Sequence, residues 1–386
     1  MKKITWLLAL LGIFAVGFVG FNIFFHAEEA DESASKQATQ TSETKTTTKS
    51  EKKDPINEMI DEMSLEEKVG QLFLARVPEV NQIEDLQTYH LGGYLLFSRD
   101  VDGETADSLM AKIQSYQDAS EIPLLIASDE EGGTVTRLSQ NPNLVTNYFQ
   151  SPQTLYAQGG LDAITQDIET KAEILQSYGI QTGLFPDADV STDPYSFIYD
   201  RTIGLDAQGT SDYVAAVVKA LDENNLGSTL KHFPGYGDNR DSHVEIVTDN
   251  RSLEELRNND FLPFEAGIEA GADSILVSHN IVTSIDATAP ASISKPIHDI
   301  LRDELNFDGV IMTDDMDMAG LANFTTQEEA GLEALQAGND LILSSSYAQQ
   351  IPYILTAIEN GEYSEKKLDQ SVYRVLAWKE KLGLLA

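Results

Sequence analysis

The stretch GVIMTDD, residues 309–315, contains the pattern on which the fold prediction rests. A short run of β-branched and apolar residues ends in two carboxylates, and segments with helical periodicity lie on both sides. Eight runs of this kind are typical of a (β/α)8 barrel, an α/β fold, because an open doubly wound sheet more often has roughly five or six strands. The runs cover residues 71–75, 93–97, 124–127, 182–186, 228–232, 274–278, 309–313 and 340–344, and helices are predicted over 161–178, 210–225, 252–270 and 326–337.

Length, charge and cysteine content exclude several classes of protein. The 386 residues are 41% apolar, which is enough for a sizeable core and excludes a wholly disordered chain. The net charge of −37 makes nucleic acid an improbable partner, because the surface repels phosphate. The absence of cysteine excludes disulfides, thiolate nucleophiles and cysteine-ligated metals.

The first 54 residues differ in composition from the rest of the chain. Residues 4–25 are uncharged and mostly apolar, follow two lysines and, as a helix, would span about 33 Å, which can cross a bilayer. A cleaved signal peptide is the alternative. We predict a membrane anchor or signal segment over residues 1–26, a disordered linker rich in Ser, Thr, Lys and Glu over 27–54, and one domain over 55–386 on the extracytoplasmic side.

Unusual polar residues gather where the predicted strands end, which is where barrels carry their chemistry. Asp129 follows the third run, Lys231 and His232 end the fifth, His279 follows the sixth, and Asp314 follows the seventh. This distribution predicts a convergent pocket.

Residues 231–243, KHFPGYGDNRDSH, are too rich in Gly, Pro, Asp and Asn to be helical, so they predict a specially shaped loop. Asp241 and His243 are two positions apart, and in an extended segment such residues project to the same side. A carboxylate that holds an imidazole suits proton transfer near neutral pH. An incidental Asp and His in a solvated loop is the alternative for this pair alone.

Asp314 lies at the end of a strand expected to be buried, with Asp315 beside it. Because neighbouring strand positions face opposite ways, one carboxylate can point to the barrel mouth while the other turns into the protein and needs a partner. Spacing alone leaves Asp314 as a nucleophile, a metal ligand or an acceptor for sugar hydroxyls. A metal bound by His232, His243, Asp241 and Asp314 is an alternative, but the first run lacks the His-x-His pair usual in barrel metallohydrolases. No metal and no cofactor are therefore predicted.

These motifs resemble those of glycoside hydrolase family 3, in particular its branch of single-domain exo-β-N-acetylglucosaminidases acting on peptidoglycan fragments. KHFPGYGDNRDSH is similar to the family's KHFPGHGD and DSH signature, DEEGGTVTRL (129–138) to its DQEGGRVxRL, and TDDMDM (313–318) to its strand-end T/S-D-x-x-M. Weaker similarities in the same order cover nearly all of residues 55–386. The resemblance implies a (β/α)8 barrel that hydrolyses terminal β-linked GlcNAc.

The resemblance also implies a role for individual residues in a retaining double displacement. Asp314 would attack the anomeric carbon, His243 would act as acid and base, and Asp241 would orient His243. Five residues match positions that bind the terminal sugar: Asp129, Arg137, Arg201, Lys231 and His232. The expected partner is a carbohydrate from cell-wall fragments.

Three positions depart from the family pattern near the pocket: Tyr236 replaces His, Glu130 replaces Gln and Thr134 replaces Arg. They bear on substrate preference more than on mechanism. A β-glucosidase or a phosphorylase of the same fold is therefore an alternative function. So is a non-catalytic sugar-binding surface protein, although such a protein would not need both a nucleophile and an Asp–His pair.

Overall fold

The computed structural model describes residues 54–237, 239–241, 246–318, 321 and 324–385. The predicted anchor and nearly all of the predicted linker lie outside these residues. Of the linker, Asp54 is described: its side chain accepts a hydrogen bond from the Ile56 backbone N–H at 3.1 Å and so caps the first helix. None of the helices in the described part of the chain is long and apolar enough to span a membrane.

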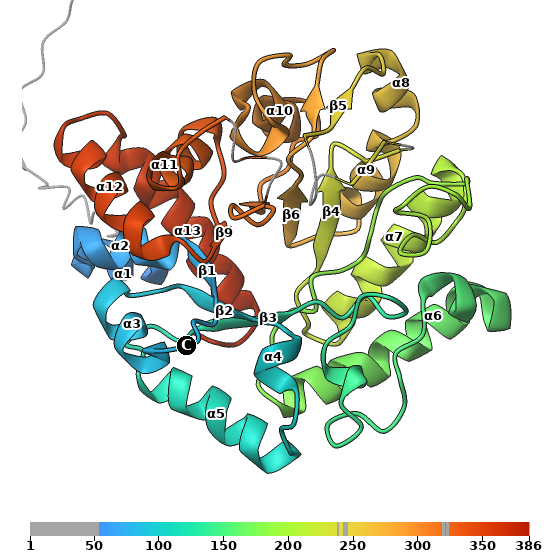
Figure 1. The fold of residues 1–386 in the computed structure, drawn as a ribbon, viewed down its shortest axis with the longest axis horizontal. Helices are drawn as coiled ribbons and strands as arrows, with labels where there is room; N and C mark the ends of the chain where they lie inside the picture. Colours follow the sequence, from blue (N-terminus) through green and yellow to red (C-terminus); the bar gives the residue numbers. More distant parts are fainter. Residues whose placement is uncertain (1–53, 238, 242–245, 319–320, 322–323, 386) are drawn as a thin grey trace, which may run out of the picture. The chain divides into compact units, whose positions relative to one another are not determined.

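Parallel strands form a barrel that helices surround (Figure 1). One sheet has the order β3-β2-β1-β9 and a second has the order β4-β6-β8. Single parallel bridges join the two sheets, from Met312 to Leu341 on one side and from Ala127 through Thr182 to Gly227 on the other. The strands are β1 (Phe73–Arg76), β2 (Gly93–Leu96), β3 (Leu125–Ser128), β4 (Thr229–Phe233), β6 (Ser274–Val277), β8 (Val310–Thr313) and β9 (Ile342–Ser344). Strands and helices alternate along the chain, and the bridges close the two sheets into one barrel. Both features agree with the predicted (β/α)8 arrangement.

Seven of the eight predicted runs coincide with strands, and the fourth, residues 182–186, differs. It contributes isolated bridges at Thr182 and Asp187 in place of a regular strand. Leu184 adopts a left-handed conformation with φ 47°, and Pro186 has no N–H to donate to a neighbouring strand. The segment therefore occupies the fourth position of the barrel without a continuous ladder.

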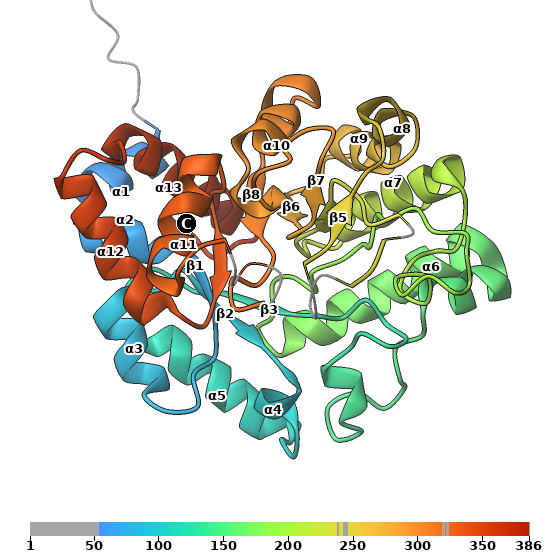
Figure 2. The same cartoon turned by 45° about the horizontal axis from the view of Figure 1, so that its top comes forward.

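The helices cover the outside of the barrel (Figures 1 and 2). The last helix packs against the first two, so the ends of the described chain meet. The helices are α1 (Pro55–Glu62), α2 (Leu65–Gln71), α3 (Gln82–Tyr89), α4 (Ser98–Val101), α5 (Ala106–Asp118), α6 (Pro152–Ser177), α7 (Ala207–Glu223), α8 (Leu253–Asn258), α9 (Phe261–Glu269), α10 (Lys295–Asp299), α11 (Gln327–Ala337), α12 (Tyr347–Glu359) and α13 (Glu365–Lys381).

The four predicted helices are present, with two differences. The stretch 252–270 forms two helices, α8 and α9, that meet at Asn259 and Asp260. Helix α6 begins before the predicted start and is broken at Gly159 and Gly160, where the backbone is not helical. A short parallel pair, β5 (Thr248–Asp249) and β7 (Ile281–Val282), follows β4 and β6 in sequence.

Strand residues of the barrel are almost all buried, and they pack with the inner faces of the helices into one core. This explains the continuous apolar runs, since a parallel strand inside a barrel meets side chains on both faces. The strand ends are thereby held rigidly, which positions the residues that follow them.

Candidate active site

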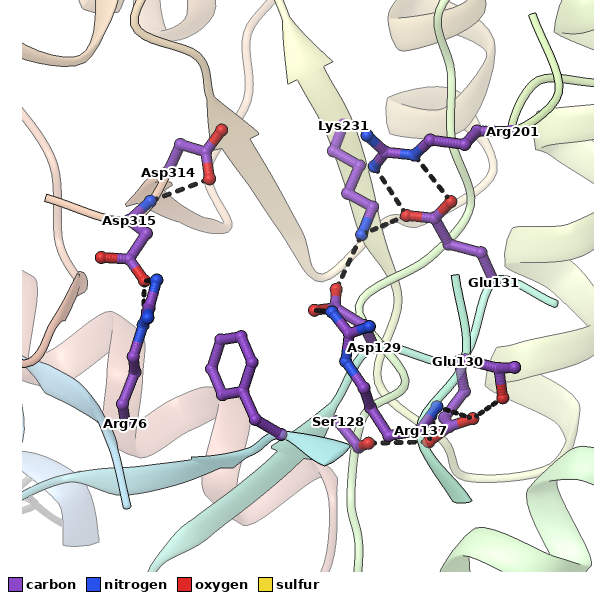
Figure 3. Close-up of polar contacts among 12 residues, drawn as sticks. Arg76, Ser128, Asp129, Glu130, Glu131, Arg137, Arg201, Lys231, Asp314 and Asp315 are labelled. Atoms are coloured by element: carbon purple, nitrogen blue, oxygen red, sulfur yellow. Dashed lines mark hydrogen bonds and ion pairs between the residues drawn. The ribbon is translucent and has the colours of Figure 1, made fainter. Parts of the chain in front are cut away.

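A cavity of about 200 Å³ lies where the strands end. Its polar lining comes from the ends of β1, β4 and β8, from the segment after β3, and from the loop before α7. Figure 3 shows Asp314 and Asp315 on one side of the site and Asp129, Lys231 and Glu131 on the other. The cavity is lined by Arg76, Leu95, Phe97, Asp129, Val135, Arg137, Leu184, Arg201, Lys231, His232, Leu276, Asp314, Asp315 and Leu343. Every predicted sugar-binding residue is therefore part of one cavity, together with Asp314.

Two carboxylates and three cations form a chain of ion pairs on one wall of the cavity, and this chain is called the ladder. Its members are Asp129, Glu131, Lys231, Arg137 and Arg201. Lys231 Nζ lies 3.0 Å from Asp129 Oδ1 and 2.6 Å from Glu131 Oε1. Arg137 Nη2 donates to Asp129 Oδ2 at 2.9 Å. Arg201 binds Glu131 through two hydrogen bonds, from Nη2 at 2.8 Å and from Nε at 3.1 Å. Each buried carboxylate therefore has two cationic partners, as a buried charge requires.

A glycine turn shapes this ladder. Gly132 and Gly133 have φ values of 97° and 61° and turn the chain directly after Glu131. A Cβ at Gly132 would lie 2.1 Å from the Gln150 carbonyl oxygen, so only glycine fits at that position. The GG of the DEEGG motif thus helps to place the two carboxylates on the wall.

The cations keep both carboxylates ionised. Burial acts to raise the pKa of Asp129, but Lys231 and Arg137 outweigh it and hold that pKa well below its usual range. Burial likewise opposes ionisation of Glu131, yet Arg201 and Lys231 lower the Glu131 pKa to about 2. Burial lowers the pKa of Lys231, and the two carboxylates more than compensate, so the net shift is upward. The wall therefore presents charged donors and acceptors at neutral pH.

His232 is neutral, and its tautomer is defined by its neighbours. Arg201 Nη2 lies 2.9 Å from His232 Nε2, and because a guanidinium only donates, Nε2 must accept. The proton is then on Nδ1, which donates to Asp189 Oδ2 at 2.7 Å. Burial, followed by the charges of Arg201 and Lys231, lowers the His232 pKa well below its usual value.

Two further carboxyl groups lie beneath His232. Asp189 accepts from the backbone N–H of Tyr236 at 2.6 Å and of His232 at 3.2 Å. Burial raises the Asp189 pKa to about 6, and burial together with the nearby Asp189 raises the pKa of Asp187 well above its usual range. The pair therefore retains a proton on Asp187 near neutral pH, and Asp187 Oδ1 accepts the backbone N–H of Asp189 at 3.0 Å.

We expect Asp187→Asn to leave the free energy of unfolding at pH 7 unchanged within about 1 kcal/mol, or to raise it. The carboxamide reproduces the protonated acid. Because the folded-state pKa of Asp187 is raised, this group costs stability as pH rises above its unfolded value of 3.8, and asparagine removes that cost. Urea unfolding between pH 4 and 8 measures the effect.

Asp189→Asn is the matched comparison. Its carboxamide would point an N–H at one of the three N–H donors that the carboxylate now accepts, at a cost of about 1–3 kcal/mol. Equal losses for the two variants at pH 7 would contradict the assignment of the proton to Asp187.

Asp314 and Asp315 follow β8 directly. Asp314 is 8% exposed, and its Oδ1 accepts the backbone N–H of Asp315 at 2.8 Å. The expectation that the second carboxylate needs a partner is confirmed, because Asp315 forms an ion pair with Arg76 from β1. Asp315 nevertheless also lines the cavity, so the two side chains do not divide cleanly between the mouth and the interior.

The predicted acid/base pair is described only in part. Asp241 is partly buried, whereas His243 lies outside the described residues. The Asp241–His243 pairing and the distance from His243 to Asp314 therefore stay predictions.

Two residues that the sequence associated with the pocket have other surroundings. His279 is fully buried and contacts Ser292 Oγ at 2.7 Å and the Asp315 carbonyl oxygen at 2.9 Å, outside the cavity lining. Glu130 is also buried and binds Ser128 and Thr136. Both side chains therefore hydrogen bond to segments beside the site and do not line the cavity.

The other two departures from the family pattern also lie off the cavity lining. Tyr236 is buried, and the centroid of its ring lies 5.0 Å from the ring centroids of both His232 and Phe197 in edge-to-face contacts, whereas Thr134 is exposed.

One group of described residues has ligand atoms spaced closely enough for a metal: Asp187, Asp189 and His232 lie within 4.8 Å of one another. The contacts already present there argue for a proton in place of a metal. Asp189 accepts the Nδ1 proton of His232, and the Arg201 guanidinium lies 3.8 Å from Asp187 Oδ2. A divalent cation would have to displace that proton and approach a fixed positive charge.

Several residues in and below the site were not predicted. Glu131 could have been found, since it is the third acid of the DEEGG strand end. Asp187 and Asp189 lie in PDADV, directly after the fourth run, where the strand-end rule also applies. Arg76 and Phe97 carry no such signal, because a single arginine or phenylalanine after an apolar run is common.

The fold and the pocket define a barrel glycoside hydrolase. The chain belongs to glycosyl hydrolase family 3: residues 64–378 match the family's N-terminal domain. A β-hexosaminidase of Xanthomonas campestris pv. campestris is 34% identical over 265 residues, which are 67% of this chain and 78% of that protein. A protein of Cellulomonas fimi named β-N-acetylglucosaminidase/β-glucosidase is 28% identical over 341 residues, or 84% of this chain.

Solved structures give the same fold. A family 3 β-N-acetylglucosaminidase from a Paenibacillus species superposes with a TM-score of 0.78 at 28% identity over 84% of this chain and 64% of that chain. LpqI of M. tuberculosis gives a TM-score of 0.76 at 27% identity over 85% of this chain and 96% of its own. This chain spans 58% of the length of the Cellulomonas protein.

Proposed function

We propose that the barrel is a retaining exo-β-N-acetylglucosaminidase that removes terminal β-linked GlcNAc from peptidoglycan fragments. The observation that carries the proposal is the position of the Asp314 carboxylate across the pocket from the Asp129–Lys231 pair (Figure 3). A terminal sugar held by that pair would present its anomeric carbon toward Asp314. The names of the Xanthomonas and Paenibacillus relatives support GlcNAc as the sugar.

The wall opposite Asp314 suits sugar hydroxyls. Ionised Asp129 accepts hydrogen bonds, and Lys231 and Arg137 donate them. The apolar side chains of Leu95, Phe97 and Leu276 supply surface for the carbon faces of a ring. Mixed donors and acceptors on rigid strand ends orient a sugar without a cofactor.

In the first proposed step, an oxygen of Asp314 forms a bond to the anomeric carbon while the bond to the leaving oxygen breaks. His243, oriented by Asp241, gives its proton to that oxygen. In the second step, His243 removes a proton from water, the water oxygen attacks the anomeric carbon, and the Asp314 carboxylate leaves. A histidine in this role, unlike a second carboxylate, adds no negative charge that would repel the ionised Asp314 carboxylate.

A chromogenic p-nitrophenyl β-GlcNAc substrate tests the activity directly. We expect the full chain to release p-nitrophenol, and a 5-fluoro GlcNAc analogue to leave one sugar on Asp314 by mass spectrometry of peptides. Undetectable release with properly folded protein would contradict the hydrolase proposal, and a sugar on any other residue would contradict the assignment of Asp314.

A β-glucosidase is the second candidate, since the Cellulomonas relative carries both names. Comparing kcat/KM on p-nitrophenyl β-GlcNAc and p-nitrophenyl β-glucoside separates the two. A phosphorylase would instead show a rate that rises with added phosphate and a sugar phosphate as product.

We further propose that residues 1–26 anchor the chain in the cell membrane and that residues 27–54 tether the barrel on the outer side. The 22 uncharged, mostly apolar residues after two lysines support this. Fractionation of cells tests it: the intact chain should sediment with membranes, and added protease should release the barrel from intact protoplasts. A shortened chain in the medium would indicate a cleaved signal peptide.

A further inference from the structure

Asp315 is held at three points around the proposed nucleophile. Its carboxylate pairs with Nε and Nη2 of Arg76. Its backbone carbonyl accepts from His279 Nε2 at 2.9 Å, which must be the protonated ring nitrogen because a carbonyl can only accept. Its backbone N–H donates to Asp314 Oδ1 at 2.8 Å. The side chain and the backbone carbonyl group of Asp315 are thus both held by hydrogen bonds, and they fix the position of the backbone N–H that contacts Asp314.

Arg76 is itself fixed. It comes from β1, which is separated from β8 by β9, so the Arg76–Asp315 pair ties together strands that are not neighbours. Its guanidinium carbon lies 4.5 Å from the centroid of the Phe97 ring, and that of Arg137 lies 5.4 Å from the same ring. Phe97 thus links the Arg76 side of the site to the arginine that binds Asp129.

The ionisation of Asp315 depends on the positive charge of Arg76. Asp315 is buried and faces Arg76 from β1, Asp314 and Asp317 from its own segment, and His279 after β6. Burial raises the Asp315 pKa to about 6, while Arg76 opposes this rise. Arg76 is the cation that favours ionised Asp315, and the Asp317 backbone N–H, which donates to Asp315 Oδ1 at 2.9 Å, acts in the same direction.

We propose that Arg76 and Asp315 form a positioning unit that holds the Asp314 carboxylate in its reactive orientation. The inference rests on the proposed function of Asp314. A fixed N–H donor restricts the rotation of the Asp314 side chain and stabilises its ionised form. That form is needed twice, as the nucleophile in the first step and as the leaving group in the second.

The test compares Arg76→Met, Asp315→Asn and the double variant in the full chain. We expect each single variant to lower kcat by about 10- to 100-fold, because a displacement of about 1 Å of a reacting group can cost 10²-fold in rate. KM should change by less than about threefold, since neither side chain is assigned to the sugar. The double variant should be about as slow as one single variant, because the two side chains act as one unit.

The pH dependence of kcat is the second readout. The acid limb in the unaltered chain should lie near the Asp315 pKa of about 6 and move to higher pH in Arg76→Met, because loss of the cation favours protonation of Asp315. Arg76→Lys should restore part of kcat and of the profile. Arg99→Met is the matched control: Arg99 pairs with exposed Glu79 at 3.2 Å, lies outside the cavity lining, and its removal should leave kcat unchanged.

Three results would overturn the proposal. The first is a double variant whose loss of kcat is the product of the losses in the two single variants. The second is an unchanged kcat in Arg76→Met. The third is a tenfold rise in the KM of Arg76→Met with kcat intact, which would make Arg76 a substrate ligand. Thermal unfolding of each variant separates misfolding from misplacement. If the unaltered chain turns over no aryl glycoside, the proposed function fails. The Arg76–Asp315 pairing can still be tested by titrating carbon-13-labelled aspartate, and an unchanged Asp315 pKa in Arg76→Met would overturn that pairing.

Discussion

Asp314→Ala is expected to lower kcat on p-nitrophenyl β-GlcNAc by about 10⁴-fold or more, because it removes the group that forms the glycosyl-enzyme. The alanine leaves space beside the anomeric carbon, and sodium azide should enter it. Azide would then restore part of the turnover and give the α-glycosyl azide, since a single displacement inverts the anomeric carbon. Rate measurements with and without azide, and NMR of the product, check both effects.

The fold should not suffer from this substitution. Asp314 accepts one backbone N–H from its neighbour, and the melting temperature of the variant should stay within a few degrees of the original. Asp303→Asn, at an exposed position before β8, is the control and should retain full activity. Turnover of Asp314→Ala at more than a tenth of the original rate would exclude Asp314 as the nucleophile, and a β-glycosyl azide would exclude the proposed stereochemistry.

Lys231→Met is expected to have the second largest effect, and to lower stability as well as activity. The Lys231 side chain is 3% exposed and is the cation shared by Asp129 and Glu131. Methionine fills similar space but removes one of the two cationic partners of each carboxylate and leaves only Arg137 with Asp129 and Arg201 with Glu131, at a cost of about 3–5 kcal/mol. The same change should reduce kcat/KM about 10²-fold or more, because a donor to the sugar is lost and the wall loses one of its three positive charges. Urea unfolding and kinetics at pH 7 measure the two effects.

The stability loss should depend on pH in a defined direction. The folded-state pKa of Glu131 is about 2 against an ordinary value of 4.5, and the Asp129 pKa is also depressed. The stability that these ionised groups contribute is therefore present above pH 4.5 and disappears as pH falls toward 2. The difference between the original chain and Lys231→Met should be full at pH 7, should begin to fall below pH 4.5 and should be smallest at pH 2 or below.

Lys68→Met gives the matched comparison for a lysine outside the site. The Lys68 side chain is 9% exposed, but its partners Glu365 and Asp369 are 62% and 39% exposed, so water screens the pairs. The expected loss is below about 1 kcal/mol. Similar losses for Lys68→Met and Lys231→Met would show that burial of the partners does not set the cost.

The barrel and most of the sugar-binding wall could be predicted from sequence because both follow from local patterns. A strand buried on two faces needs a continuous apolar run, and the chain leaves the barrel at a defined residue after each run. Asp129, Lys231, His232 and Asp314 each stand at such a position, so the rule that chemistry collects at strand ends was sufficient to find them. The same rule misassigned His279, since it gives the end of the strand but not the direction of the side chain.

The amino-acid sequence by itself predicted the (β/α)8 order and one pocket for Asp129, Lys231, His232 and Asp314, because periodicity and strand ends are properties of neighbouring residues. Only the tertiary structure decided which charges pair. Arg76 meets Asp315 across 239 positions of chain, and Arg201 meets Glu131 across 70. Such pairs depend on how strands align around the barrel and on how far burial strengthens each charge, and neither quantity is written in any short stretch of sequence.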